Sequence, residues 1–180
     1  MNRISASLVA LFALLLFCRA SAANGHFTPY VLMENDGSRE PADADRLIAV
    51  NGTLFFRAFS GSFSEALWKS DGTRDGTVRV HSVSPPAGAE VFQIQAAVGD
   101  TLFYAANILQ GGELWKSDGT EVGTVRVKDI RPGPDRSSPG LLSNVDGTLF
   151  FMANGGIGAS GLWKSDGTEL GTNLLQAANT

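Results

Sequence analysis

Three aspartates in a repeated heptapeptide are the residues of this chain with the clearest capacity for chemistry. The heptapeptide Leu-Trp-Lys-Ser-Asp-Gly-Thr occurs at residues 67–73, 114–120 and 162–168. Its aspartates are Asp71, Asp118 and Asp166. Calcium binds the oxygens of such loops, but it takes about six to eight of them. One carboxylate per loop is too few, so the sequence favours a turn-forming aspartate and leaves a weak calcium site as the alternative.

The glycine after each aspartate supports the turn. A glycine adopts positive φ without steric cost, and an aspartate accepts hydrogen bonds from nearby backbone N–H groups. The three glycines are Gly72, Gly119 and Gly167. The pattern therefore predicts a tight turn between two strands in each copy.

The tryptophan and the lysine of the heptapeptide each admit two interpretations. The tryptophans are Trp68, Trp115 and Trp163, and the lysines are Lys69, Lys116 and Lys164. Tryptophan could stack on a sugar ring, but at a repeated strand position it is more typical of packing between sheets. We expect the lysines on a solvated strand edge, with a ring of ammonium groups that binds an acidic polysaccharide as the alternative.

No other group of residues indicates catalysis. The chain lacks a Gly-x-Ser-x-Gly nucleophile elbow, and neither His26 nor His81 has a second histidine at metal-ligand spacing. A glycosidase would need two carboxyl groups about 5 to 10 Å apart in one pocket. The sequence therefore predicts a non-enzymatic protein without a cofactor, and a glycosidase or lyase is the less favoured alternative.

Residues 1–22 are predicted to form a secretory signal peptide. Arg3 gives a positive start, residues 8–17 form an apolar run too short to span a bilayer, and residues 20–22 read Ala-Ser-Ala. We expect cleavage near Ala22, a secreted or cell-envelope location, and no membrane insertion afterwards. Cys18 raises a lipid anchor as an alternative, although its neighbours are large or charged. The formal charge of −4 becomes more negative on cleavage, which disfavours nucleic acid as a partner.

The positions of the heptapeptide indicate a repeat architecture. The tryptophans are 47 and 48 residues apart, and a period of about 20 to 50 residues is typical of one structural unit stacked in an array. Each unit has four strand-like segments, and the first two are joined by hairpin turns at 51–52, 99–100 and 146–147. The expected strands are 46–50, 53–59, 66–70, 77–83, 91–97, 101–106, 113–117, 124–130, 141–145, 148–153, 162–165 and 172–176.

Four strands per repeat predict an all-β fold of about three four-stranded antiparallel propeller-type blades. Residues 46–180 form this repeat region, and residues 23–45 form an N-terminal strand and loop. A twisted β-sandwich is the alternative, but it would not require one motif at a fixed interval.

The second repeat resembles the ELWxxDGT repeat family most closely. Residues 112–124 read Gly-Glu-Leu-Trp-Lys-Ser-Asp-Gly-Thr-Glu-Val-Gly-Thr, and residues 146–151 match a second stretch typical of the family. The resemblance covers about residues 30–176 and implies tandem propeller-type blades in an exported bacterial protein, with a layout similar to that of kelch repeats. Ala66 and Gly161 replace the glutamate that only Glu113 keeps, which disfavours a catalytic or ligand role for that position in every blade.

The loops at the other end of each unit differ from repeat to repeat. Recognition is often carried by variable loops on a rigid scaffold. We therefore expect a binding face for an extracellular protein or polysaccharide there. The polar residues expected to contribute are Glu65, Arg131, Asp135 and Arg136.

Three blades are too few to close a propeller, which takes about four to eight. We expect an incomplete propeller, or one closed by self-association, with apolar faces open on the first and third repeats. Two chains would give six blades, and a strand at residues 30–33 could pair with the partner's third blade. A truncated repeat protein that acts only in self-assembly is the alternative function.

Overall fold

The protein is an all-β structure of three four-stranded antiparallel sheets, as predicted from the sequence. The structure is a computed structural model, and it describes residues 16–17, 30–31, 42–59, 65–82, 92–108 and 111–178. These residues include no helix, and hence none that is long and apolar enough to cross a membrane.

Each of the three sheets is a meander whose hydrogen-bonded order follows the chain. The first sheet contains β3 (Ala42–Val50), β4 (Thr53–Phe59), β5 (Glu65–Ser70) and β6 (Val78–Ser82). The second contains β7 (Phe92–Val98), β8 (Thr101–Ile108), β9 (Gly111–Ser117) and β10 (Val125–Lys128). The third contains β11 (Gly140–Val145), β12 (Thr148–Asn154), β13 (Ser160–Ser165) and β14 (Asn173–Ala177).

All twelve expected strands are present, with ends shifted by a few residues. The largest shift is in β3, which begins at Ala42 because Ala42 pairs with Phe59 at the far end of β4. The last strand of each sheet carries a register shift, which places two of its residues opposite one position on its neighbour.

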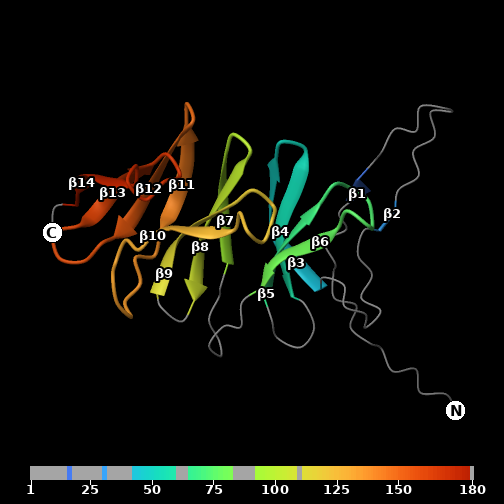
Figure 1. Cartoon of the computed structure of the whole chain (residues 1–180), viewed down its shortest axis with the longest axis horizontal. Helices are drawn as coiled ribbons and strands as arrows, with labels where there is room; N and C mark the ends of the chain where they lie inside the picture. The colour runs from blue at the N-terminus through green and yellow to red at the C-terminus, as the bar shows by residue number, and fades with distance from the viewer. Residues whose placement is uncertain are drawn as a thin grey trace, which may run out of the picture.

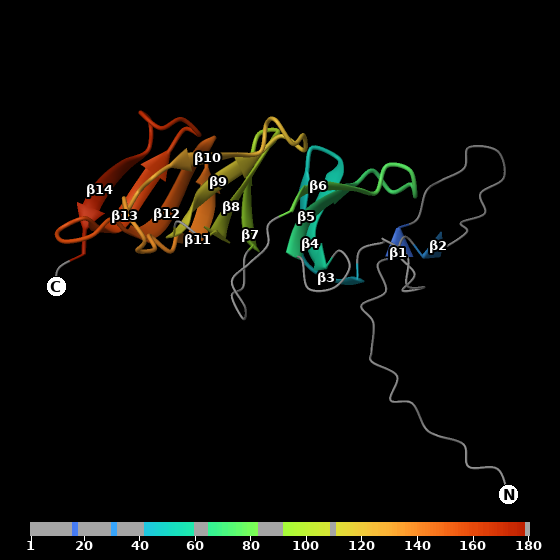
Figure 2. The ribbon, with the colours of Figure 1, turned by 60° about the horizontal axis from the view of Figure 1, so that its bottom comes forward.

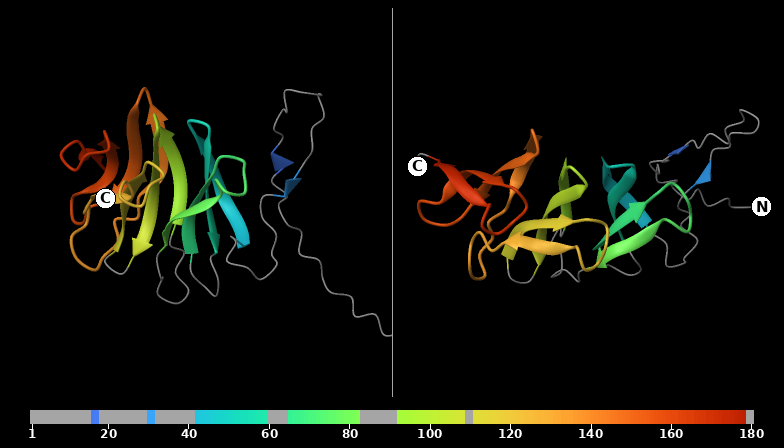
Figure 3. Two further views of the ribbon diagram at one scale, coloured as in Figure 1. Left: turned by 45° about the vertical axis from the view of Figure 1, so that its right-hand side comes forward. Right: turned by 45° about the horizontal axis from the view of Figure 1, so that its top comes forward.

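The three sheets lie in a row, in the order of the chain (Figure 1). The views in Figures 2 and 3 keep this order. The first strands of the sheets are adjacent, so that β7 contacts both β3 and β11. Each sheet is an antiparallel meander. The hairpin between its first and second strands and the heptapeptide turn between its third and fourth strands therefore lie at the same end of the sheet.

The sheets pack face to face through apolar side chains at equivalent repeat positions. In the first sheet Val50, Phe55, Leu67 and Val80 point toward the second sheet, where they pack with Leu102, Tyr104 and Ala106. In the second sheet Phe103, Leu114 and Val127 point toward the third and pack with Leu149, Phe151 and Trp163. Strands that are apolar on both faces are typical of sheets buried between neighbours.

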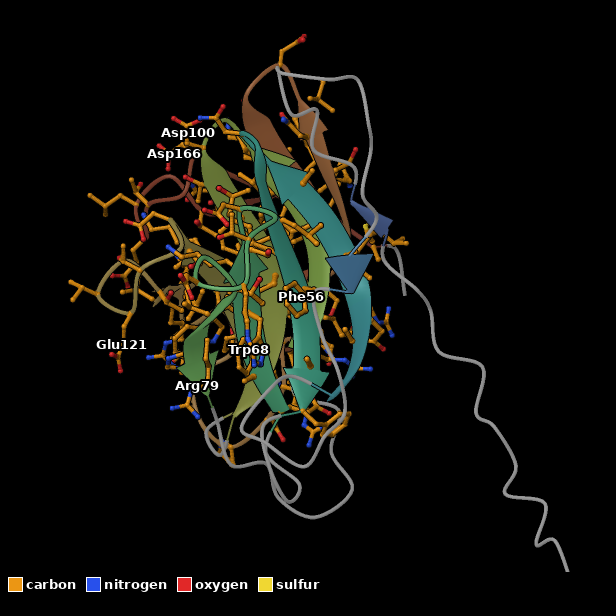
Figure 4. All side chains as sticks on the ribbon, turned by 90° about the vertical axis from the view of Figure 1, so that its right-hand side faces the viewer. Phe56, Trp68, Arg79, Asp100, Glu121 and Asp166 are labelled. Carbon is orange, nitrogen blue, oxygen red and sulfur yellow. The ribbon has the colours of Figure 1, made fainter. Side chains whose placement is uncertain are left out.

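The two end faces of the row differ from each other. On the third sheet Val145 is 50 % exposed, Leu162 37 % and Leu175 45 %, so this face is open as expected. On the first sheet Phe56 and Trp68 stack on each other and are 1 % and 6 % exposed. Figure 4 shows both rings on the face turned away from the second sheet. The expectation of an open face on the first repeat is therefore wrong.

A further pair of strands lies beyond the first sheet (Figure 1). β2 (Tyr30–Val31) lies within the strand expected at residues 30–33, and it pairs antiparallel with β1 (Leu16–Phe17) of the same chain. Residues 32–33, and the segment predicted to be a signal peptide apart from residues 16–17, lie outside the described residues.

Phe103 and Phe150 occupy the same repeat position in environments that differ, which gives a matched test of the packing. Phe103 is buried between two sheets, whereas Phe150 is half-buried on the open face of the third. Phe103→Ala is expected to lower the free energy of unfolding by about 3 to 5 kcal/mol. Phe150→Ala should lower it by only about 1 kcal/mol. Urea denaturation measures both, and equal losses would contradict the proposed packing.

Candidate functional site

The aspartate of each heptapeptide closes its own turn. The Oδ1 atom of Asp118 accepts hydrogen bonds from the Thr120 backbone N–H at 2.8 Å and from the Thr120 hydroxyl at 2.7 Å. Asp71 and Asp166 bind Thr73 and Thr168 in the same way. These hydrogen bonds, from the threonine hydroxyl first, hold the pKa of Asp118 and of Asp166 below its ordinary value. Asp118 and Asp166 therefore stay ionised, and all three carboxylates are engaged by their own loops.

The second glycine of each turn lies directly against this carboxylate. A Cβ on Gly123 would come within 2.1 Å of Asp118 Oδ1, and on Gly76 or Gly171 the corresponding distances are 1.9 and 2.0 Å. Such contacts leave no room for a side chain. The spacing Asp-Gly-Thr-x-x-Gly thus has a steric cause, because any larger residue at the last position would displace the aspartate.

The other polar groups of the turn are also paired inside it. The hydroxyls of Ser117 and Thr124 lie 2.8 Å apart, and Ser117 Oγ accepts a hydrogen bond from the Gly119 N–H. The other two turns repeat this arrangement. Within the described part of the chain, no three His, Cys, Asp or Glu side chains gather where they could hold a metal ion.

The lysines of the heptapeptide connect neighbouring repeats. Lys116 Nζ donates a hydrogen bond to the Gly167 carbonyl at 2.8 Å, which joins the second sheet to the third turn. Lys69 lies against Gly119 in the same way, with its Nζ 3.4 Å from the position that a Cβ would take there. Lys164, at the same position in the third repeat, is exposed. Lys116 is therefore an inter-sheet contact and not the solvated edge residue that the sequence predicted.

The three tryptophans occupy equivalent positions in their sheets, but their surroundings differ. Trp163 is buried between the second and third sheets and stacks on Phe151, with ring centroids 6.4 Å apart. Trp115 is partly buried between Tyr104 and His81, a residue of the first sheet. Trp68 is buried on the outer face of the first sheet.

The residues expected to form a binding face are only partly brought together. Arg131 and Asp135 lie in the loop between β10 and β11 and form an ion pair at 2.8 Å, and Arg136 is exposed beside them. Glu65 is placed differently from the expectation, because its side chain is buried and lies 3.6 Å from Arg57. Glu65 therefore does not belong to an exposed polar surface.

Backbone contacts anchor the loop at residues 131–139. The N–H groups of Ser137 and Ser138 donate to the Gly112 carbonyl, and the Asn154 N–H donates to the Ser137 carbonyl at 2.7 Å. These bonds tie the loop both to the start of β9 and to the end of β12. The charged tip of the loop thus stands on a fixed base.

Glu113 lies beneath this loop and is a residue to which the sequence assigned no role. It is 1 % exposed, and its Oε2 accepts hydrogen bonds from the Ile130 N–H at 2.9 Å and the Ser137 hydroxyl at 2.7 Å. Its Oε1 and the Oδ1 of Asp129 are both buried without a hydrogen-bond partner among the described residues. Burial raises the pKa of Glu113 above its ordinary value, and the charge of Asp129 adds to this effect.

The glutamate could have been found only by comparing the repeats. Glu113 is replaced by Ala66 and Gly161 at the equivalent positions, which indicated that its role is local to the second repeat. No protein-family model matches this chain, and no curated protein matches it at a significant level.

Gly123→Ala tests the steric cause of the turn spacing. The added methyl group collides with Asp118, so we expect a loss of about 1 to 3 kcal/mol in the free energy of unfolding. Gly140→Ala is the matched control, because its Cβ would meet nothing closer than 4.0 Å, and it should change stability by less than about 0.5 kcal/mol. Asp118→Ala combined with Gly123→Ala should cost less than the sum of the two single changes. Strict additivity would refute the clash.

Glu113→Gln tests the buried carboxyl through the pH dependence of stability. Because burial raises the pKa of Glu113, its stabilising contribution is complete below the ordinary pKa of glutamate and is lost as pH rises through the raised value. Glutamine cannot ionise, and its side-chain oxygen can accept the same two hydrogen bonds. The stability of Glu113→Gln relative to the unchanged chain should therefore grow with rising pH between about pH 4 and pH 8.

Glu113→Ala is the companion variant for this measurement. It leaves the Ile130 N–H without its acceptor, whereas the Ser137 hydroxyl can still donate to the Gly112 carbonyl at 2.8 Å. The loss should cost about 1 to 3 kcal/mol across the pH range. Urea denaturation at several pH values measures both variants. A stability difference between Glu113→Gln and the unchanged chain that does not vary with pH would contradict the raised pKa.

Proposed function

We propose that this chain is an exported, non-catalytic repeat module of the ELWxxDGT type, built of propeller-type blades. In this proposal the loop at residues 131–139 binds an extracellular protein or polysaccharide that carries negative charge. The observation that carries the proposal is the division of polar groups between the two ends of the sheets. The heptapeptide turns use their polar groups internally, whereas the loop presents its charged groups to solvent.

The packing supports propeller-type blades. Successive four-stranded meanders lie face to face with their first strands adjacent, which is the relation that blades have around a propeller axis. Lys116 donates a hydrogen bond to the Gly167 carbonyl of the following turn, and Lys69 lies beside Gly119 at the equivalent place one repeat earlier. The heptapeptide thus serves the stacking of repeats and leaves recognition to other residues.

The charged loop suits an anionic ligand. Arg131 and Arg136 supply two guanidinium groups, which bind carboxylate and sulfate oxygens through paired N–H donors. Asp135 holds Arg131 through an exposed ion pair, whose contribution to stability is only about 0 to 1 kcal/mol. A ligand carboxylate can therefore take the place of Asp135 at little cost.

A hydrolase is less well supported. Glu113 and Asp129 interact electrostatically, and a glycosidase requires a pair of carboxyl groups. However, Glu113 is 1 % exposed and is covered by Ser137, so a sugar cannot reach it. The raised pKa of Glu113 has a structural explanation in its burial under the loop.

A glycan array that spans neutral, carboxylated and sulfated polysaccharides tests the proposal. We expect binding to the anionic members and at least a tenfold loss of affinity in the double variant Arg131→Ala/Arg136→Ala, equivalent to about 1.4 kcal/mol. The matched control is Glu169→Gln, a change at an exposed acidic residue in the third heptapeptide turn, which should leave affinity unchanged. Immobilised acidic protein is the second probe.

Two outcomes would overturn the proposal. The first is binding that survives the double arginine variant. The second is the release of shorter oligosaccharides during incubation, which would indicate a glycosidase or a lyase.

A further inference from the structure

The open face of the third sheet repeats the composition of the two interfaces inside the molecule. Four positions in each repeat point toward the next sheet. In the third repeat they are Val145, Phe150, Leu162 and Leu175, which correspond to Val50, Phe55, Leu67 and Val80 in the first and to Val98, Phe103, Leu114 and Val127 in the second. In the first and second repeats these positions are buried or half-buried against the following sheet.

The third repeat keeps these residues apolar although no described part of the chain covers them. Leu67 and Leu114 are fully buried, whereas Leu162 at the same position is among the exposed large hydrophobic side chains. Met152 pairs with Leu162 across the strands and is also exposed, which extends the apolar area. A contiguous exposed apolar area of this kind is typical of a protein interaction surface.

The polar residues of the face do not oppose association. On the central strands β12 and β13, the charged side chain that lies on the open face is that of Lys164, at the end next to the heptapeptide turn. The remaining polar positions on these strands are neutral, for example Thr148, Asn154 and Ser160. Charge depletion at the centre of a surface with polar groups at its edge is typical of interfaces between proteins.

The closed face of the first sheet restricts how a second copy can bind. Head-to-tail stacking would place the open face against Phe56 and Trp68 of another chain, but both are already buried within their own chain. An open face can instead meet its own counterpart across a two-fold axis. Such an isologous contact is the commonest form of homodimer and uses the same patch on both subunits.

We propose that two copies of this chain dimerise by packing the open faces of their third sheets against each other. Phe150, Leu162 and Leu175 of each copy form the centre of the interface, and Lys164 extends to its edge with its ammonium group in water. The fraction of dimer should rise with protein concentration, as for any reversible association. This inference is independent of ligand binding by the loop at residues 131–139.

Light scattering after size-exclusion chromatography, over a hundredfold range of concentration, measures the dimer. We expect the mass to rise from one chain toward two, and Leu162→Lys or Leu175→Lys to shift the midpoint at least tenfold. The matched controls are Leu170→Lys and Ile157→Lys, because these side chains are 92 % and 107 % exposed and lie in loops outside the strands that form the face. Circular dichroism and urea denaturation at low concentration verify that each variant is folded.

A cysteine test separates this dimer from head-to-tail stacking. Within the molecule, Lys128 Nζ contacts the Glu169 carbonyl of the next repeat. The residues at the equivalent repeat positions are Gln176 in the third repeat and Arg74 in the first. Head-to-tail stacking would therefore bring Gln176 of one copy next to Arg74 of the other. In a Cys18→Ser background, the double variant Gln176→Cys/Arg74→Cys should give no more disulfide-linked dimer than Gln176→Cys alone. Linkage that requires both cysteines would overturn the two-fold arrangement. A monomer at all concentrations, or a dimer that Leu162→Lys leaves intact, would overturn the proposed interface.

Discussion

The architecture depends on the need of each sheet for an apolar neighbour on both faces. Phe55 and Phe56 are adjacent in β4 and point to opposite sides, and both are almost fully buried. A strand of this kind is unstable at a water-exposed surface, because each face would expose side chains worth about 1.5 to 3 kcal/mol apiece in burial. In the row, the second sheet has an apolar neighbour on both faces. Only the outer faces of the first and third sheets need another cover.

The heptapeptide turn is stabilised by its own residues and also contributes to the stacking of the sheets. The Asp118 carboxylate, held by Thr120 and pressed against Gly123, fixes the backbone of the turn without help from another sheet. The fixed turn can then present a carbonyl to the lysine of the preceding repeat, as Gly167 does to Lys116. The residues that look most like a binding site in the sequence are therefore occupied by the scaffold itself.

Two surfaces of the described residues are proposed to interact with other molecules, and they differ in chemistry. The loop at residues 131–139 is charged and stands on buried anchors, among them Glu113 and Ser137. The open face of the third sheet is apolar and nearly uncharged. A loop of the first kind suits a soluble anionic ligand, whereas a face of the second kind suits another protein surface.

The sequence by itself determined the repeat, the twelve strands and their turns, because hairpin residues and alternating side chains act over a few positions. Only the tertiary structure decided which apolar faces are covered. It buries Phe56 and Trp68, leaves Leu162 open, and withdraws Glu65 from the surface beside Arg57. These outcomes depend on contacts between residues far apart in the chain, which local patterns do not encode. For the same reason the burial of Glu113 beneath a loop was not predictable from its position in the motif.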